Sequence, residues 1–410
     1  KTQETQPAVS GICMRISCGR CSGRSELSLG IFLAVLASLF VNIQCWPFPG
    51  AAGMPSSGPP ALTPATLDRI RGSLWGLYIG DALAMPTHWY YDQNHLKRTF
   101  GTIKGFVKPV DILPGSIMSL SNTGGGGRGS NSGDIVGGVI LKGKKKYWER
   151  GGNYFYHRGM AAGENTLEGI ITRLITNVIT EKGTYDHDEV LNRYIPLMTT
   201  PDAHNDTYAG TAHRMFFANW VKGVEPRKCP DNDGHNTDSL DGLVNLPPVV
   251  FASMLAGEQA THQSTTQCAA LFRKSTVLPK FSLLLADLLV DLVGGTPTRD
   301  AVASCARRVG VDIAREVERS GGRDPMTACY VTQSFPAMLH FAYKYAETPE
   351  EALLANANTG GENVARGAVL GAVLGAGVGL KGLPVHLVQG LHNHDEIAVE
   401  IDAFVAALTH

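Results

Sequence analysis

The stretch GGENVARGAVLGAVLGAGVG, residues 360–379, carries a glycine at every fourth position of an apolar run. Residues four apart lie on the same face of a helix, so this spacing predicts a helix with one glycine-lined face. Each interior glycine costs roughly 0.5–1 kcal/mol relative to alanine, and close packing of a second backbone would offset that cost. The run has about 14 apolar residues, fewer than the ~20 that span a bilayer. We therefore predict a central buried helix that packs on Gly76 and Gly80 of an earlier helix, with its own glycines at Gly367, Gly371, Gly375 and Gly379.

The rest of the chain from residue 66 also has helical periodicity. TLDRIRGSLWGLYIGDALAM (66–85) has apolar residues three and four apart, and LEGIITRLITNVITEKG (167–183) repeats this pattern up to a terminal glycine. Alternating strand patterns are nearly absent. We expect an all-α, single compact multi-helix domain over residues 66–410, built around the glycine-rich helix.

The first 65 residues differ in composition. A basic leader (1–28) precedes a hydrophobic segment (29–46) and a Pro/Gly/Ser linker (47–65). Basic residues followed by a short apolar run are typical of a secretory or organelle-targeting signal. A signal anchor in the membrane and mistranslated upstream sequence are the alternatives, and a start at Met54 would leave a cytoplasmic protein.

The charge of the chain excludes one class of partner. With 410 residues and a formal net charge of −1, the chain has no general attraction for nucleic acid or anionic membranes. Its cysteines after the linker lie in apolar surroundings and are typical of buried free thiols rather than a disulfide framework: Cys229, Cys268, Cys305 and Cys329.

The glycine-dense segment 114–134 lies between predicted helices. GGGGRG lacks the preceding strand and the acidic residue of a dinucleotide-binding fingerprint, and it lacks the Gly-Lys-Ser/Thr of a P-loop. We expect either a mobile lid whose backbone N–H groups hold an anion or a plain surface loop. GKKKYW (143–148), just after it, indicates a solvated basic surface.

Five polar groups of residues are not explained by packing. They are GDALAMPTHWYYD (80–92), GENTLEG (163–169), PDAHNDTYAGTAHR (201–214), CPDNDGHNTDSLDGL (229–243) and GGENVAR (360–366). In the second, Glu164 and Glu168 are four apart, which predicts that both lie on one helical face. The third contains His204, Asp206 and His213.

The fourth group is acidic enough to test for a calcium loop. Counting from Asp231, the sixth residue is Asn236 and the twelfth is Gly242, so an EF-hand is excluded. His235, Asp238 and Asp241 would instead form one stripe at a helix start. Metal or substrate binding there and simple helix capping remain as two interpretations.

GSLWGLYIGDALAMP (72–86) resembles the opening motif of the ADP-ribosylglycohydrolase family. GENT (163–166) stands where that family has Thr-Asp-Asp-Thr, and GGENVA (360–365) stands where it has Gly-Gly-Asp-Thr-Asp-Thr. HWYYD (88–92), NTGGGGRG (122–129) and HNTDSLD (235–241) are similar to its divergent branch of J-type crystallins and selenoprotein J.

The resemblance implies an all-α fold with a pair of Mg²⁺ ions held between the two motifs against a substrate ribose. Glu164 and Glu362 keep a carboxylate at the family positions, Asn165 keeps a neutral oxygen, and Val364 keeps no ligand atom. The implied activity is hydrolysis of an ADP-ribosyl or related ribosyl glycosidic bond, with an ADP-ribose-containing small molecule or an ADP-ribosylated protein as partner. A catalytically inactive ligand-binding or structural member and a hydrolase of another N-glycoside are the alternatives.

The expected site residues combine this overlay, in which Glu164 and Glu362 are neighbours across one pocket, with the polar groups and the glycine-dense segment described above. The acidic cluster 231–241 would supply replacement metal ligands. The expected catalytic residues are Glu164, Asp81 and Glu362. The expected substrate-binding residues are His88, Asn122, Gly125, Gly126, Gly127, His235 and Asn363. The expected metal ligands are Glu164, Asn165, Glu362, Asp238 and Asp241.

Overall fold

A computed structural model of the chain describes residues 60–116, 118, 123–125 and 133–409. The chain divides after Ser56, and the part from Ser57 onward is one compact unit. The described residues contain isolated β-bridges but no strand, so the all-α prediction is confirmed. The predicted segments 1–28 and 29–46, most of 47–65, and Asn122, Gly126 and Gly127 lie outside the described residues.

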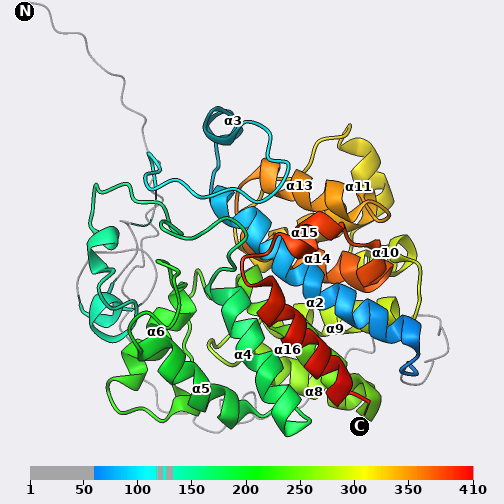
Figure 1. The fold of residues 1–410 in the computed structure, drawn as a ribbon, viewed down its shortest axis with the longest axis horizontal. Coiled ribbons are helices and arrows are strands. Elements are labelled where there is room, and N and C mark those ends of the chain that lie inside the picture. Colours follow the sequence, from blue (N-terminus) through cyan, green and yellow to red (C-terminus); the bar gives the residue numbers. More distant parts are fainter. Residues whose placement is uncertain (1–59, 117, 119–122, 126–132, 410) are drawn as a thin grey trace, which may run out of the picture. The chain divides into compact units, whose positions relative to one another are not determined.

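The α-helices follow one another along the chain, with the longest connections between α3 and α4 and between α6 and α7 (Figure 1). Their bounds are α2 (Pro64–Ala84), α3 (Gln93–Phe100), α4 (Leu167–Lys182), α5 (His187–Thr199), α6 (Thr211–Trp220), α7 (Leu246–Ser253), α8 (Glu258–Ala269), α9 (Leu278–Val293), α10 (Thr298–Arg308), α11 (Ile313–Arg319), α12 (Val331–Lys344), α13 (Pro349–Thr359), α14 (Val364–Val378), α15 (Val385–Gln389) and α16 (His394–Ala407).

Local sequence explains where the principal helices begin and end. Thr63 caps α2 by accepting a hydrogen bond from the Thr66 N–H, and Pro64 stands at the first helical position, where its missing N–H costs nothing. Gly183 ends α4 in the left-handed conformation, as the sequence predicted. These signals are local, which is why they can be identified without the tertiary structure.

The centre of the fold is the packing of α14 against α2. All residues of α14 from Val364 to Ala376 are buried. A Cβ atom at Gly76 would lie 2.1 Å from the Gly371 carbonyl oxygen, and one at Gly80 would lie 1.9 Å from that of Gly367. Because real Cβ atoms do not approach backbone this closely, glycine is required along this line of contact. The predicted central helix and its pairing with Gly76 and Gly80 are confirmed.

One detail of that prediction is wrong. Gly379 follows the last residue of α14 and has a φ of +74°, so it ends the helix instead of lining its face. The partner of Gly375 is Gly72, whose carbonyl oxygen would lie 1.9 Å from a Cβ atom at Gly375. The glycine contact therefore extends one turn further toward the start of α2 than the sequence suggested.

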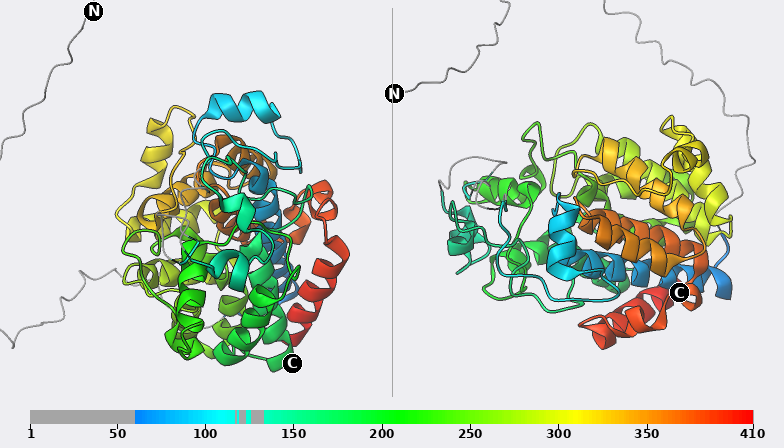
Figure 2. Two further views of the ribbon diagram at one scale, coloured as in Figure 1. Left: turned by 90° about the vertical axis from the view of Figure 1, so that its left-hand side faces the viewer. Right: turned by 90° about the horizontal axis from the view of Figure 1, so that it is seen from above.

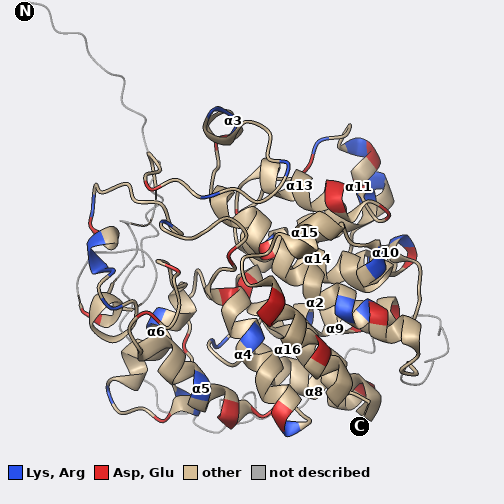
Figure 3. Cartoon of the chain, in the orientation of Figure 1, with Lys and Arg blue, Asp and Glu red and all other residues tan. Residues whose placement is uncertain are grey.

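Other helices cover this central pair. α16 contacts both α2 and α4, and it lies along the outside of the helical unit in both views of Figure 2. On the other side, α9, α12 and α13 contact α14. Lys and Arg are interspersed with Asp and Glu on outer helices such as α5 and α11 (Figure 3), in agreement with the small net charge. Among the described residues, no helix has the length and apolar character needed to cross a membrane.

The cysteines of the described residues are free. Cys229, Cys268 and Cys305 are buried, as predicted, whereas Cys329 is only half-buried. Burial raises the pKa of the Cys268 and Cys305 thiols to about 12, which keeps both protonated and unreactive at neutral pH.

Replacing Gly371 by alanine tests the central packing. We expect Gly371→Ala to lower the free energy of unfolding by more than about 3 kcal/mol, because its Cβ would lie 1.9 Å from the Gly76 carbonyl oxygen. Gly105→Ala is the control, since nothing lies within 4 Å of a Cβ atom there. Urea denaturation of the two variants checks this, and equal, small losses would contradict close backbone packing.

Candidate functional site

A cavity opens where the C-terminal end of α2 meets the starts of α4 and α14. The segments 206–214, 236–241 and 328–330 complete its wall. The starts of α4 and α14 thus meet at one cavity, as predicted from the two Gly-Glu-Asn stretches. The ionisable groups that line it, apart from tyrosine and cysteine, are His88, His157, Glu168, Asp206, Arg214, Asp241 and Glu362.

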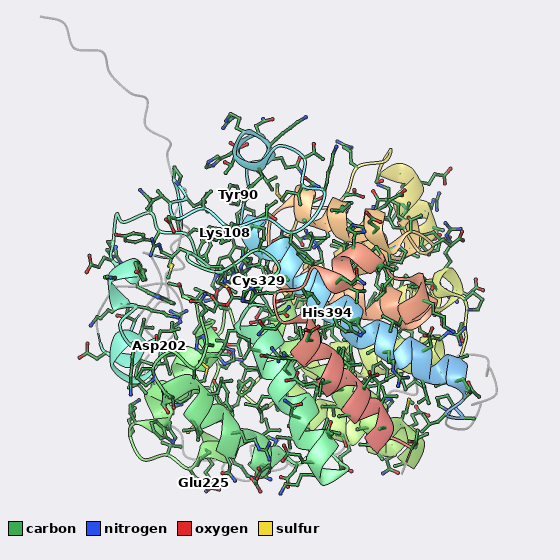
Figure 4. The ribbon with its side chains drawn as sticks, viewed as in Figure 1. Tyr90, Lys108, Asp202, Glu225, Cys329 and His394 are labelled. Carbon is green, nitrogen blue, oxygen red and sulfur yellow. The ribbon has the colours of Figure 1, made fainter. Side chains whose placement is uncertain are left out.

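Glu362 is fixed in the cavity wall by the backbone around it. Gly361 forms an antiparallel bridge with Tyr90, labelled in Figure 4, and a Cβ atom at Gly360 would lie 2.4 Å from the Tyr90 carbonyl oxygen. Glu362 Oε1 accepts a hydrogen bond from Ala365 N at 3.2 Å and so caps α14. The side chain is 4% exposed, and Oε2 has no hydrogen-bond partner among the described residues. Glu362 therefore lines the cavity and has one buried carboxylate oxygen with unused hydrogen-bonding capacity.

A chain of buried groups leads from Glu362 to Asp206. Glu362 Oε1 lies 3.4 Å from His88 Nε2, His88 Nδ1 lies 2.7 Å from His157 Nε2, and His157 Nδ1 lies 2.8 Å from Asp206 Oδ1. Hydrogen bonds join His88, His157 and Asp206, whereas His88 Nε2 has no hydrogen-bond partner among the described residues and lies only at ion-pair distance from Glu362. A proton can pass along the whole chain when this last pair closes to hydrogen-bond distance.

The electrostatics of this chain differ between its ends. Burial acts to raise the pKa of Asp206, but the charge and hydrogen bond of His157, with the amides of Leu167 and Tyr208, bring it down to about 2. Burial lowers the pKa of His88. Asp206 is therefore ionised at neutral pH, and its Oδ1 accepts a hydrogen bond from the Nδ1–H of His157.

Lys144 holds the segment that carries Asp206. Its ammonium group donates to the carbonyl oxygens of His204, Asn205 and Asp206 at 3.2, 2.9 and 2.7 Å. The interpretation of GKKKYW as a solvated surface is therefore wrong for this half-buried lysine, because three converging carbonyls replace its hydration.

The second carboxylate with a free oxygen is Glu168, in the first turn of α4. Its Oε1 lies 2.8 Å from His213 Nε2, and His213 Nδ1 lies 2.7 Å from the Tyr194 hydroxyl. Glu168 Oε2 is buried and has no hydrogen-bond partner among the described residues. Glu168 and Glu362 therefore both line the cavity, each lies against one histidine, and each has a second oxygen without a hydrogen-bond partner among the described residues.

Asp241, the third carboxylate in this part of the wall, is engaged on both oxygens. Arg273 Nη1 lies 2.8 Å from Oδ1 and Nη2 lies 3.4 Å from Oδ2, while the Ser239 hydroxyl also donates to Oδ1. Burial acts to raise the pKa of Asp241, and the Arg273 guanidinium outweighs it and lowers that pKa. Asp241 is thus an ionised, fully paired group.

Aromatic side chains and one arginine also line the cavity. Trp89 stacks on His88 with ring centroids 4.1 Å apart and meets Tyr208 edge-on at 5.1 Å. The backbone φ of Trp89 is +59°, a strained conformation for a bulky residue. The backbone N–H of Trp89 donates a hydrogen bond to the Gly361 carbonyl oxygen at 2.7 Å. Arg214 is buried at the cavity and lies over the Trp148 ring.

Asp81 supports the site from behind. It accepts hydrogen bonds from Thr166 N at 2.7 Å, Thr166 Oγ1 at 2.6 Å and Asn165 Nδ2 at 2.9 Å, while Asp206 Oδ2 accepts from Leu167 N at 2.9 Å. Two carboxylates therefore hold the positive end of α4. Asp81 and Asn165 are buried and neither lines the cavity.

The structure separates the expected site residues into three groups. Those that line the cavity are His88, Asp241 and Glu362. Those that are buried behind it are Asp81, Asn165 and Asn363, the last donating to the Thr87 hydroxyl at 2.7 Å. Those that lie elsewhere among the described residues are Glu164, Gly125, His235 and Asp238.

The helical geometry expected for two of these groups is wrong. Glu164 precedes the first residue of α4, Leu167, so it shares no helical face with Glu168. Its Oε2 accepts hydrogen bonds from Ala161 N and Asn205 Nδ2 at 2.6 and 3.2 Å. Asp238 precedes a short 3-10 helix, Leu240–Leu243, and accepts a hydrogen bond from the Ser275 hydroxyl, so no helical stripe with His235 forms.

The sequence did not identify several residues that line the cavity or, like His213, bind a lining residue. Glu168, Asp206 and His213 stood in the polar groups singled out from the sequence, but nothing local ranked them above Glu164 or His204. His157 lies in YFYHRGM (154–160), an aromatic stretch with no polar cluster that would have marked it.

The residues at the family's metal-binding positions do not fit a pair of Mg²⁺ ions. From those positions only Glu362 brings a free carboxylate oxygen to the cavity, and octahedral Mg²⁺ needs several converging oxygens. Within the described residues, the one group of three side chains that could hold a metal ion is Glu258, His262 and Asp287, on α8 and α9, and it does not line the cavity.

Comparison with known proteins agrees with this fold. The model of the ADP-ribosylglycohydrolase family matches residues 62–409, and the chain belongs to that family. A solved structure described as an ADP-ribosylglycohydrolase-related protein complex is similar over 84% of this chain and 99% of its own, with a TM-score of 0.55 and 19% identity. At that identity the likeness shows a shared fold. Among curated proteins, none matches the chain significantly.

The pH dependence of stability tests the position of Asp81. Burial raises its pKa from 3.8 to about 6, although the hydrogen bonds from Thr166 and Asn165 act against this. Between these values the folded state keeps a proton that the unfolded chain loses, so stability falls as pH rises, by about 3 kcal/mol in total. Asp81→Asn cannot ionise and should lack this loss.

Urea denaturation at intervals from about pH 4 to about pH 7 measures the difference between the two proteins. Exposed Asp202, replaced by asparagine, is the matched control and should follow the parent. A difference between parent and Asp81→Asn that stays constant with pH would contradict a buried carboxyl that takes up a proton.

Proposed function

We propose that this protein hydrolyses a ribosyl glycosidic bond of an ADP-ribosyl compound, with Glu168 and Glu362 as the catalytic carboxylates. The supporting observation is that both side chains line the same cavity and that each has one buried oxygen with no hydrogen-bond partner among the described residues. A pair of carboxylates is the usual machinery for cleavage at an anomeric carbon, one acting as acid and the other as base or nucleophile. Membership of the ADP-ribosylglycohydrolase family supports the ribosyl substrate.

We infer which carboxylate is the acid and which is the base from the last group in each chain of contacts, Asp206 behind Glu362 and Tyr194 behind Glu168. His157 and His88 lead from Glu362 to ionised Asp206, an anion that favours keeping a proton within the chain, whereas His213 leads only to the neutral Tyr194 hydroxyl. Glu362 therefore protonates the leaving atom as its bond to the anomeric carbon breaks. Glu168 takes a proton from the attacking water, whose oxygen forms the new bond to that carbon.

The rest of the wall suits a nucleotide-like substrate. Trp89 and Tyr208 offer aromatic surface for a base or a ribose, and Arg214, which lines the same cavity, supplies a cation for a diphosphate. The buried carboxylates alone would repel such a substrate, so a cation in the wall is needed to admit it.

Two single substitutions test this assignment. We expect Glu362→Gln and Glu168→Gln each to lower kcat by at least about 100-fold, because an amide neither donates nor accepts a catalytic proton. The assay uses the full chain with ADP-ribosyl-arginine, ADP-ribosyl-serine and O-acetyl-ADP-ribose. Glu149→Gln, an exposed position, is the matched control and should retain parental activity. Full activity of either cavity variant would contradict the assignment of Glu168 and Glu362 as the catalytic carboxylates.

Glu164→Gln separates two assignments. The family overlay makes Glu164 catalytic and predicts a loss as large as for Glu362→Gln. In the proposal based on geometry, Glu164 only fixes a turn through Ala161 and Asn205, so kcat should fall by less than about tenfold. The ratio of the two losses in kcat decides between them.

A ligand-binding protein without activity is the second candidate function. It is favoured by Val364, an apolar residue that lines the cavity where the family motif has an acid. Calorimetry with ADP-ribose that shows binding, together with no turnover of the three substrates, would establish this alternative. The branch of J-type crystallins and selenoprotein J, and a targeting role for residues 29–46, are further proposals from the sequence.

A further inference from the structure

We propose that this cavity binds and processes its ligand without a divalent metal ion, because side chains of the protein hold the carboxylates that an ion would otherwise hold. For the reaction itself this inference rests on the proposed function, but its metal-binding consequence can be tested without any substrate. The disagreement between the family's ligand positions and the residues present here motivates it.

Each carboxylate of this part of the wall has a nitrogen partner within the protein. His88 lies against Glu362, His213 binds Glu168 and Arg273 binds Asp241. These three partners are themselves buried, with at most 6% of their surface exposed. Such partners are held in place by packing, so a metal ion would have to displace them from fixed positions to gain more than one oxygen from any carboxylate.

The remaining family ligand positions are turned away or changed. Asn165 donates its amide hydrogens to Asp81 and to the Tyr78 carbonyl oxygen, and Asn363 donates to Thr87. Val364 has no ligand atom. Among the carboxylates that line the cavity, a dinuclear site would be left with one free oxygen each of Glu168 and Glu362, so that water or substrate would have to supply nearly every other ligand of both ions.

The charge that metal ions supply to an anionic substrate is available from the protein. Arg214 lines the cavity. Asp241 also lines it, and its negative charge is neutralised by its ion pair with Arg273. Protein cations of this kind can stabilise a diphosphate without a bridging ion.

The triad of Glu258, His262 and Asp287 could bind a metal ion away from the cavity, so a test must distinguish binding there from binding in the cavity. His262 Nε2 lies 2.5 Å from Asp287 Oδ1, and Arg308 also pairs with Asp287. Because this group lies on α8 and α9, metal bound there says nothing about the cavity.

The test titrates Mg²⁺ and Mn²⁺ into the metal-free full chain and follows binding by calorimetry and by the Mn²⁺ paramagnetic resonance signal. Matched variants remove either the cavity oxygens (Glu168→Gln, Glu362→Gln) or the triad (His262→Ala), and circular dichroism checks that each is folded. No binding, or binding that persists in both cavity variants, supports the inference. Binding that is lost in the cavity variants and retained in His262→Ala overturns it.

A second measurement addresses the ligand. The dissociation constant of ADP-ribose should agree within about twofold between EDTA and Mg²⁺. Tenfold or larger weakening in EDTA would overturn the inference, whereas an absence of ADP-ribose binding in both conditions would count against the proposed function and leave the metal titration to decide the inference.

Discussion

The backbone contact between α2 and α14 is the constraint on which the site depends. Gly72, Gly76 and Gly80 meet Gly375, Gly371 and Gly367 in reverse order, so the two helices run antiparallel. The C-terminal end of α2 therefore lies beside the start of α14, and His88, just beyond α2, lies against Glu362, just before α14. Larger residues along this line would separate the helices and with them the segments that carry His88 and Glu362.

A second layer of buried polar contacts converts this packing into a defined cavity. Asp81 near the end of α2 and Asp206 from a distant loop both accept hydrogen bonds from the start of α4, which fixes Glu168 relative to α2. The bridge of Gly361 to Tyr90 fixes Glu362 relative to Trp89. Since unsatisfied buried groups are costly, these contacts tie the functional side chains to the stability of the fold.

The sequence predicted what depends on short-range periodicity and missed what depends on long-range contact. A glycine every fourth residue identifies the face of α14, and the family motifs identify Glu362 and His88. Whether Glu164 or Glu168 enters the cavity depends on where α4 begins, and Asp81 and Asp206 fix that start from 85 and 39 residues away. His157 acquires its importance only through contacts with His88 and Asp206, which no local pattern records.

The most direct test of this account is a crystal structure of the protein soaked with ADP-ribose in the presence of EDTA. The account predicts that the terminal ribose lies between Glu168 Oε2 and Glu362 Oε2, with the diphosphate toward Arg214 and no metal ion between ligand and protein. A ribose bound at Glu164 or outside the cavity would contradict it.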